Sequence, residues 1–131
     1  MTPVPPNAPL VLIVDDSDRN RKLARDVLRA AGLRTIEAAD GHAALALASE
    51  SLPDVILLDL RLPDMDGTDV ARALRDGVRT ARIPVVALSA LRAGDDHGAL
   101  SAVGFAGRLE KPIDVRAFAG QVRGYCRAEG C

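Results

Sequence analysis

Unbroken apolar runs recur along the chain, and each ends in a polar or charged residue. The clearest runs cover residues 10–14, 55–58 and 83–88. None of them alternates apolar with polar positions, so both faces of each segment are expected to be buried, as in the inner strands of a parallel sheet. Shorter segments at 33–38 and around 108–109 predict two further strands.

The segments between these strands carry apolar residues at helical spacing, which predicts helices packed against the sheet. The first helix is expected to begin at a cap formed by Ser17 or Asp18 and to end at Gly32. Its apolar face is expected to hold Leu23, Ala24, Val27, Leu28 and Ala31.

Four further helices follow the same alternation. Asp40 is expected to cap the second, the third covers 67–76, and the fourth covers 93–103, where Gly94 and Gly98 interrupt the pattern. Asp114 is expected to cap the last helix, with an apolar face of Val115, Phe118, Ala119, Val122 and Tyr125. Five strands alternating with five helices predict an α/β fold, in which right-handed crossovers place helices on both faces of one five-stranded parallel sheet.

A chain of 131 residues is long enough for one domain with its own core. Residues 1–9 contain four prolines and are expected to form a flexible tail. The domain is expected over 10–127, followed by a short C-terminal tail at 128–131.

Charge and composition exclude several partners. The formal net charge is -1 and aromatic residues make up 2% of the chain, so neither a basic field nor stacking platforms favour nucleic acid. No signal peptide is visible, and no apolar run approaches the roughly 18 residues that a membrane-spanning helix requires. Cys126 and Cys131 are interpreted as free thiols of a reducing cytosol, which predicts a cytoplasmic protein.

Polar side chains follow four of the expected strands: Asp15 and Asp16, then Asp59, Ser89 and Lys111. Because the carboxyl ends of parallel strands meet at one edge of the sheet, these residues are expected to share one pocket. Neighbouring carboxylates repel one another, so a cation must offset them, and Mg²⁺ is a hard ion that accepts a few protein oxygens and keeps waters for a phosphate. Lys111 supplies a positive charge suited to phosphate, and Ser89 supplies a hydroxyl donor.

This arrangement predicts phosphoryl chemistry at Asp59, whose carboxylate can attack a phosphoryl group and form an aspartyl phosphate. Such a reaction requires mainly positioning and charge neutralisation from the protein. We expect the metal to bind Asp16, Asp59 and the main-chain carbonyl of Arg61, with Asp15 acting through a metal-bound water.

Each of these features also has a simpler structural interpretation. The Asp15-Asp16 pair can cap a helix, and Ser89 can merely end a strand, but their occurrence together with Asp59 and Lys111 favours a site. Asp64 and Asp66 suggest a calcium loop, yet the required acids are missing at Leu62 and Ala73, so they are interpreted as loop and cap residues.

Four motifs in order carry a family resemblance: Val14-Asp15-Asp16, the segment from Leu57 to Gly67, Ala87-Leu88-Ser89-Ala90 and Glu110-Lys111-Pro112. Together they resemble the signature of bacterial response-regulator receiver domains, over nearly the whole chain after the proline-rich tail. The resemblance implies a flavodoxin-like (βα)5 fold and Mg²⁺-dependent phosphotransfer to Asp59 from a histidine kinase or histidine phosphotransfer protein. The chain ends just past the fifth helix, as in stand-alone receivers of the cell-fate and chemotaxis type.

The resemblance also implies roles for individual residues. Lys111 would form a salt bridge to the phosphoryl group, the bond before Pro112 would be cis, and Ser89 would be the hydroxyl that moves toward the phosphate. The protein would catalyse only its own phosphotransfer and dephosphorylation, and is otherwise no enzyme. Its output would be a change in binding to a downstream protein, across the fourth helix, fifth strand and fifth helix, in a monomer or weak dimer.

One position departs from the family pattern. Where receivers usually have Tyr or Phe, three residues before Lys111, this chain has Arg108. A guanidinium is always charged and resists burial, so we expect Arg108 to stay largely exposed and the aromatic coupling to be absent or replaced. This departure leaves open a degenerate receiver that binds proteins without phosphorylation. A haloacid-dehalogenase-type phosphohydrolase is disfavoured, because Arg61 stands where a second acid is required.

Overall fold

The computed structural model describes residues 7–90, 103–111 and 113–125. The helix expected over 93–103 therefore lies outside the described residues, except for its last position. The described elements, in chain order, are β1 (Leu10–Val14), α1 (Asp18–Ala30), β2 (Arg34–Ala38), α2 (Gly41–Ser51), β3 (Val55–Asp59), α3 (Gly67–Asp76), β4 (Val85–Ala90), β5 (Gly107–Lys111) and α5 (Phe118–Tyr125).

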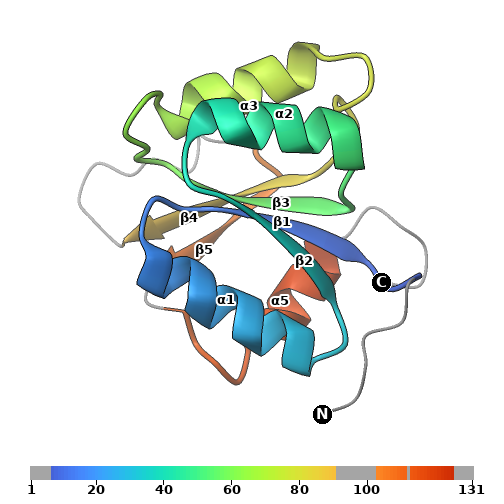
Figure 1. Ribbon diagram of the computed structural model, residues 1–131, viewed down its shortest axis with the longest axis vertical. Helices are drawn as coiled ribbons and strands as arrows, with labels where there is room; N and C mark the ends of the chain where they lie inside the picture. Colours follow the sequence, from blue (N-terminus) through green and yellow to red (C-terminus); the bar gives the residue numbers. More distant parts are fainter. Residues whose placement is uncertain (1–6, 91–102, 112, 126–131) are drawn as a thin grey trace.

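The five strands form one parallel sheet in the order β2-β1-β3-β4-β5. Helices α2 and α3 cover one face, and α1 and α5 cover the other, as Figure 1 shows. The predicted α/β architecture is confirmed. Within the described residues, no helix combines the length and the apolar character needed to cross a membrane.

Strand β3 lies at the centre of the sheet, and all of its residues are buried. Its side chains alternate between two cores: Ile56 and Leu58 pack under α2 and α3, whereas Val55 and Leu57 pack with α1 and α5. Burial on both faces explains why the run shows no apolar–polar alternation. Asp59 is the last residue of this strand, so the packing of the strand fixes the position of its side chain.

The register of the sheet brings the carboxyl ends of the inner strands to one edge. Val14 pairs with Leu58, and Asp59 with Leu88, while Lys111 pairs with Ala90. Residues that are far apart in sequence therefore lie within side-chain reach of each other at this edge.

The last helix begins later than the sequence predicts. The Asp114 carboxylate accepts a hydrogen bond from the backbone N–H of Arg116 (3.0 Å), which forms a turn, and α5 starts only at Phe118. Val115 lies in that turn and is 56% exposed, so its expected place on the apolar face of the helix is wrong. A short acidic side chain that bonds its own backbone competes with the first helical turn.

Helix α1 begins and ends where the sequence predicts, but one residue expected on its buried face is exposed. Ser17 caps it by accepting from the Asn20 N–H (3.3 Å), and Gly32 follows its end with φ of 88°, a left-handed conformation that favours glycine. Leu23, however, is 40% exposed, because the buried face of α1 is centred on Ala24 and Leu28.

Two further expectations differ from the structure. Arg108 is partly buried rather than largely exposed. It lies on the edge strand β5, where the aliphatic stem of an arginine can cover apolar surface while its charged end reaches water. Ala8, expected in the flexible tail, is 8% exposed, and its carbonyl oxygen accepts from Nε of Arg34 (2.8 Å).

The glycine that begins α3 is tightly enclosed by backbone. A methyl group at Gly67 would lie 2.7 Å from the Asp59 carbonyl oxygen and 2.7 Å from Cα of Leu60. We expect Gly67→Ala to lower the free energy of unfolding by about 2 kcal/mol through overpacking. Urea denaturation measures the effect.

Gly120 provides the matched control, because a methyl group placed there would meet no atom within 4 Å other than those of its chain neighbours and its own helix backbone. We expect Gly120→Ala to raise the free energy of unfolding by about 0.5–1 kcal/mol, since alanine favours the helix. Equal effects of the two substitutions would contradict the close approach at Gly67.

Candidate functional site

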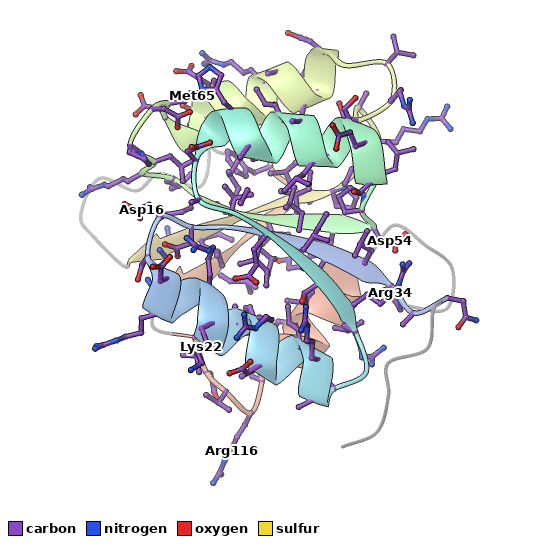
Figure 2. All side chains as sticks on the ribbon, in the orientation of Figure 1. Asp16, Lys22, Arg34, Asp54, Met65 and Arg116 are labelled. Carbon is purple, nitrogen blue, oxygen red and sulfur yellow. The ribbon has the colours of Figure 1, made fainter. Side chains whose placement is uncertain are left out.

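Three carboxylates gather where β1 and β3 end. Asp15, Asp16 and Asp59 each place an oxygen within 4.8 Å of the others. Asp15 and Asp59 are 1% and 9% exposed, whereas Asp16 faces solvent. Figure 2 shows Asp16 at the end of the sheet where β1 leads into α1, opposite the end that carries Asp54. The site is therefore open on the side of Asp16 and closed behind the other two acids.

Lys111, the last residue of β5, forms ion pairs with both buried acids. Its Nζ lies 2.8 Å from Oδ2 of Asp15 and 3.1 Å from Oδ2 of Asp59. Strand β4 separates β5 from β3 in the sheet, so the lysine side chain extends from the edge strand to the central carboxylate. One ammonium group thus holds the carboxylates of two other strands together.

The loop after β1 is held by hydrogen bonds on both of its sides. Oδ1 of Asp15 accepts from the Ser17 N–H (2.9 Å), and the Asp15 carbonyl oxygen accepts from Nη1 of Arg21 (2.7 Å). Sequence reasoning missed Arg21. The one available signal was its position three residues after Asp18, with which it forms an ion pair.

The loop after β3 begins with a turn that engages the candidate nucleophile. Oδ1 of Asp59 accepts from the Arg61 N–H (3.1 Å), and Arg61 forms an antiparallel bridge with Asp66. The Gly67 N–H donates to the Leu60 carbonyl oxygen (2.9 Å). This closed loop places the main chain of Arg61 next to the carboxylate of Asp59.

Asp64 attaches the same loop to the start of α2. Its carboxylate accepts from the backbone N–H groups of Gly41 (2.8 Å) and His42 (3.0 Å), and also contacts Nδ1 of His42. The Gly41 hydrogen bond is the main cause that lowers the pKa of Asp64 to about 2. Met65 packs against Gly41, and a methyl group placed at Gly41 would lie 2.7 Å from Sδ of Met65. Asp64 is thus a loop residue that binds the first N–H groups of α2. The N-cap of α2 is Asp40, as predicted, and its carboxylate accepts from the Ala43 N–H (2.8 Å).

The ionisation of the central pair reflects burial and pairing. Loss of hydration raises the pKa of Asp59, and this outweighs the lowering effects of the Arg61 N–H and Lys111. Burial alone would lower the pKa of Lys111, but its contacts with Asp15 and Asp59 prevail, and that pKa is raised. Lys111 therefore stays charged, whereas ionised Asp59 lacks part of the solvation it would have in water.

Four of the predicted site residues are brought together: Asp15, Asp16, Asp59 and Lys111. The backbone of Ser89 lies in β4, but its side chain lies outside the described part of the structure, as does Pro112.

The donor set fits a hard divalent cation. Carboxylate and main-chain oxygens are the ligands that Mg²⁺ prefers, and it keeps several waters. The three carboxylate oxygens within 4.8 Å of one another and the exposed side chain of Asp16 match that requirement.

Comparisons with known proteins agree with this geometry. The family model described as "Response regulator receiver domain" matches residues 11–123. The polar-differentiation response regulator DivK of Brucella anthropi is 37% identical over 115 residues, covering 88% of this chain and 94% of the relative. The DivK protein of Brucella ovis matches to the same extent.

Solved structures show the same similarity. The chemotaxis protein CheY4 of Vibrio cholerae superposes with a TM-score of 0.84 at 30% identity, over 90% of this chain and 98% of the other. The receiver domain of a Pseudomonas aeruginosa sensor histidine kinase, whose structure has a magnesium ion coordinated in the active-site cleft, gives 0.82 at 29% identity over 90% and 97%.

The raised pKa of Asp59 predicts a pH-dependent stability difference. A folded-state pKa above the unfolded value means that the folded protein binds more protons in the interval between the two values, so stability falls as pH rises through that interval. Asp59→Asn removes this titration. Without divalent ions, we expect the free energy of unfolding of Asp59→Asn, relative to wild type, to increase from pH 4 upward and then level off.

Urea denaturation of both proteins at a series of pH values measures this difference. A difference that stays constant, or that shrinks as pH rises, would contradict the burial effect at Asp59.

Proposed function

The chain belongs to the response regulator receiver domain family, and on that premise we propose that it accepts a phosphoryl group on Asp59. The donor would be a histidine kinase or a histidine phosphotransfer protein. The observation that carries the proposal is the shared contact of the Lys111 ammonium with Asp15 and Asp59 at the carboxyl edge of the sheet. This contact keeps a charged carboxylate in a largely buried position where it can meet an incoming phosphorus atom.

The proposed reaction is a displacement at phosphorus. A carboxylate oxygen of Asp59 forms a bond to phosphorus, the phosphorus–nitrogen bond of the donor phosphohistidine breaks, and the electron pair returns to the imidazole nitrogen. Lys111 stays protonated and offsets the charge that the phosphoryl group brings. The Arg61 N–H holds Oδ1 of Asp59 in place during the approach.

Asp16, Asp59 and the Arg61 carbonyl would hold Mg²⁺, with Asp15 acting through a bound water. When bound, the ion would supply charge neutralisation on the phosphoryl oxygens. Support for these ligands comes from the clustered carboxylates and from the loop that places the Arg61 main chain beside Asp59.

The output of the reaction would be a change in binding to a downstream protein. Ser89 pairs with Glu110, and Ala90 with Lys111, so strands β4 and β5 run side by side up to the site. A shift of Lys111 or Ser89 toward a phosphoryl group would therefore also displace the edge strand β5. We assign the output surface to this strand and α5, together with the fourth helix that the sequence predicts over 93–103, which lies outside the described residues except for its last position.

Labelling with a small phosphodonor tests the acceptor. With acetyl phosphate and Mg²⁺, we expect wild type to gain one phosphoryl group, measured by intact-protein mass spectrometry, and Asp59→Asn to gain none, because the nucleophile is missing. The control is Asp76→Asn, which alters an exposed carboxylate at the end of α3, away from the site, and which should still be labelled.

A second function, a receiver that binds its partner without phosphorylation, is favoured by Arg108 at the usual aromatic position. Wild type that neither takes up phosphate nor binds beryllofluoride with Mg²⁺ would support it. Labelling of wild type that persists in Asp59→Asn would instead place the acceptor elsewhere.

The donor protein must dock beside the site, and the structure offers an apolar contact there. Leu23 of α1, 40% exposed, lines a small cavity of about 50 Å³ together with Asp15 and Lys111. Val115, in the turn after β5, is also exposed. We propose that the histidine-bearing partner packs across α1 and this turn, which would bring its phosphohistidine to Asp59.

Leu23→Ala tests this docking surface. We expect about tenfold slower phosphotransfer from a purified histidine kinase or phosphotransfer protein that labels wild type, since truncating an interface anchor costs more than about 1 kcal/mol. Labelling by acetyl phosphate should be unchanged, because the chemistry at Asp59 is untouched.

The control is Val78→Ala, which shortens a 98% exposed side chain after α3. It should leave both rates unchanged. Equal losses from the protein donor and from acetyl phosphate in Leu23→Ala would place the defect in the site rather than in docking.

A further inference from the structure

Helix α1 presents a row of arginines to strand β2. Nε of Arg29 donates to Oγ1 of Thr35 (2.9 Å), and Nη1 of Arg25 lies 3.4 Å from Oε2 of Glu37. Nε of Arg21 lies 3.6 Å from the other oxygen of Glu37. The row is spaced four residues apart, so these side chains share one face of the helix.

Arg21 differs from the others because its guanidinium also reaches the site loop. Nη1 donates to the Asp15 carbonyl oxygen at 2.7 Å, while Nη2 pairs with Asp18. The side chain is 16% exposed, which is low for an arginine at the start of a helix. Its planar fork thus connects the loop, the first turn of α1 and strand β2 at once.

The Asp15 carbonyl belongs to the peptide group that joins Asp15 to Asp16. Because that group is planar, a fixed carbonyl oxygen also fixes the plane that contains the nitrogen and Cα of Asp16. Asp16 itself is exposed, so packing does little to orient it. The hydrogen bond from Arg21 therefore restricts where the Asp16 carboxylate can point.

We propose that Arg21 is a positioning residue for the metal site: it holds the Asp15–Asp16 peptide so that the Asp16 carboxylate faces Asp59. The inference rests on the proposed Mg²⁺ site. Glu37 would act as the anchor on β2 that keeps the guanidinium in place. Outer contacts of this kind orient ligands and are worth about 10–100-fold in metal affinity.

The direction in which Mg²⁺ affinity changes when Arg21 is removed distinguishes a positioning role from a purely electrostatic one. The Arg21 guanidinium binds the carbonyl oxygen of the loop that carries the acids and repels a divalent cation bound beside that loop. If Arg21 acted only through its charge, removing it would therefore tighten Mg²⁺ binding. If Arg21 positions the loop, removing it weakens binding even though a repelling charge is lost.

Mg²⁺ titration of the full chain, followed by amide NMR shifts at constant ionic strength and without phosphodonor, measures the affinity. We expect Arg21→Gln to weaken Mg²⁺ binding by about tenfold. Arg21→Lys keeps the charge but loses the fork, so it should weaken binding by a smaller factor. The matched control is Arg25→Gln, which removes the other partner of Glu37 and should leave the affinity within about twofold of wild type, since it makes no contact with the loop.

Thermal melting separates these effects from general destabilisation. Similar losses of Tm in Arg21→Gln and Arg25→Gln, with weakened Mg²⁺ binding in Arg21→Gln alone, would support positioning. Unchanged or tighter binding in Arg21→Gln, or equal weakening in Arg25→Gln, would overturn it. If Arg21→Gln does not fold, Arg21→Lys decides, because unchanged binding there would overturn the proposal.

Different results would contradict the proposed metal site and the proposed role of Arg21. Wild type that binds no Mg²⁺ would remove the metal site itself. Wild type that binds Mg²⁺ while Arg21→Gln binds it equally well would remove only the role of Arg21.

Discussion

One ammonium group shared by two buried carboxylates is the constraint on which this molecule depends. Taking Asp15 and Asp59 out of water costs several kcal/mol for each charge, and the contacts with Lys111 offset part of that cost. The compensation is incomplete, because the pKa of Asp59 remains raised. Two carboxylates share one ammonium group, so the site keeps a surplus of negative charge that a divalent cation can offset.

The sheet makes that contact possible. Asp59 ends a strand that is buried on both faces, and Lys111 ends the edge strand, so the two meet only if β4 lies between them in parallel register. The same apolar runs that form the core therefore fix the site geometry to within the length of a lysine side chain. The same strands form the core and place the site residues, so a change of register would disrupt both the packing of the core and the contact between Asp59 and Lys111.

The sequence was sufficient for the strands and for the placement of Asp15, Asp16, Asp59 and Lys111 at their ends, because unbroken apolar runs and strand-end charges are local signals. It was insufficient where side-chain exposure depends on distant neighbours. Leu23 has helical spacing but lies beside the buried face of α1, and the turn made by Asp114 moves Val115 to the surface. Arg108 is partly buried, although charge alone predicts exposure, since a long side chain can lie along the edge strand.

The sequence also failed to predict the long-range hydrogen bonds. These bonds connect the loops of the site to the helices on both faces of the sheet. The loop before α1 is fixed by Arg21, which belongs to the helical layer on one face of the sheet. The loop after Asp59 is fixed by Asp64 to α2, which belongs to the layer on the opposite face. Asp59 accepts from the Arg61 N–H of the second loop and shares Lys111 with Asp15 of the first loop, so the site is in contact with both layers. If only one of these loops were bound to a helix, Asp59 would be connected to the helices on one face of the sheet alone.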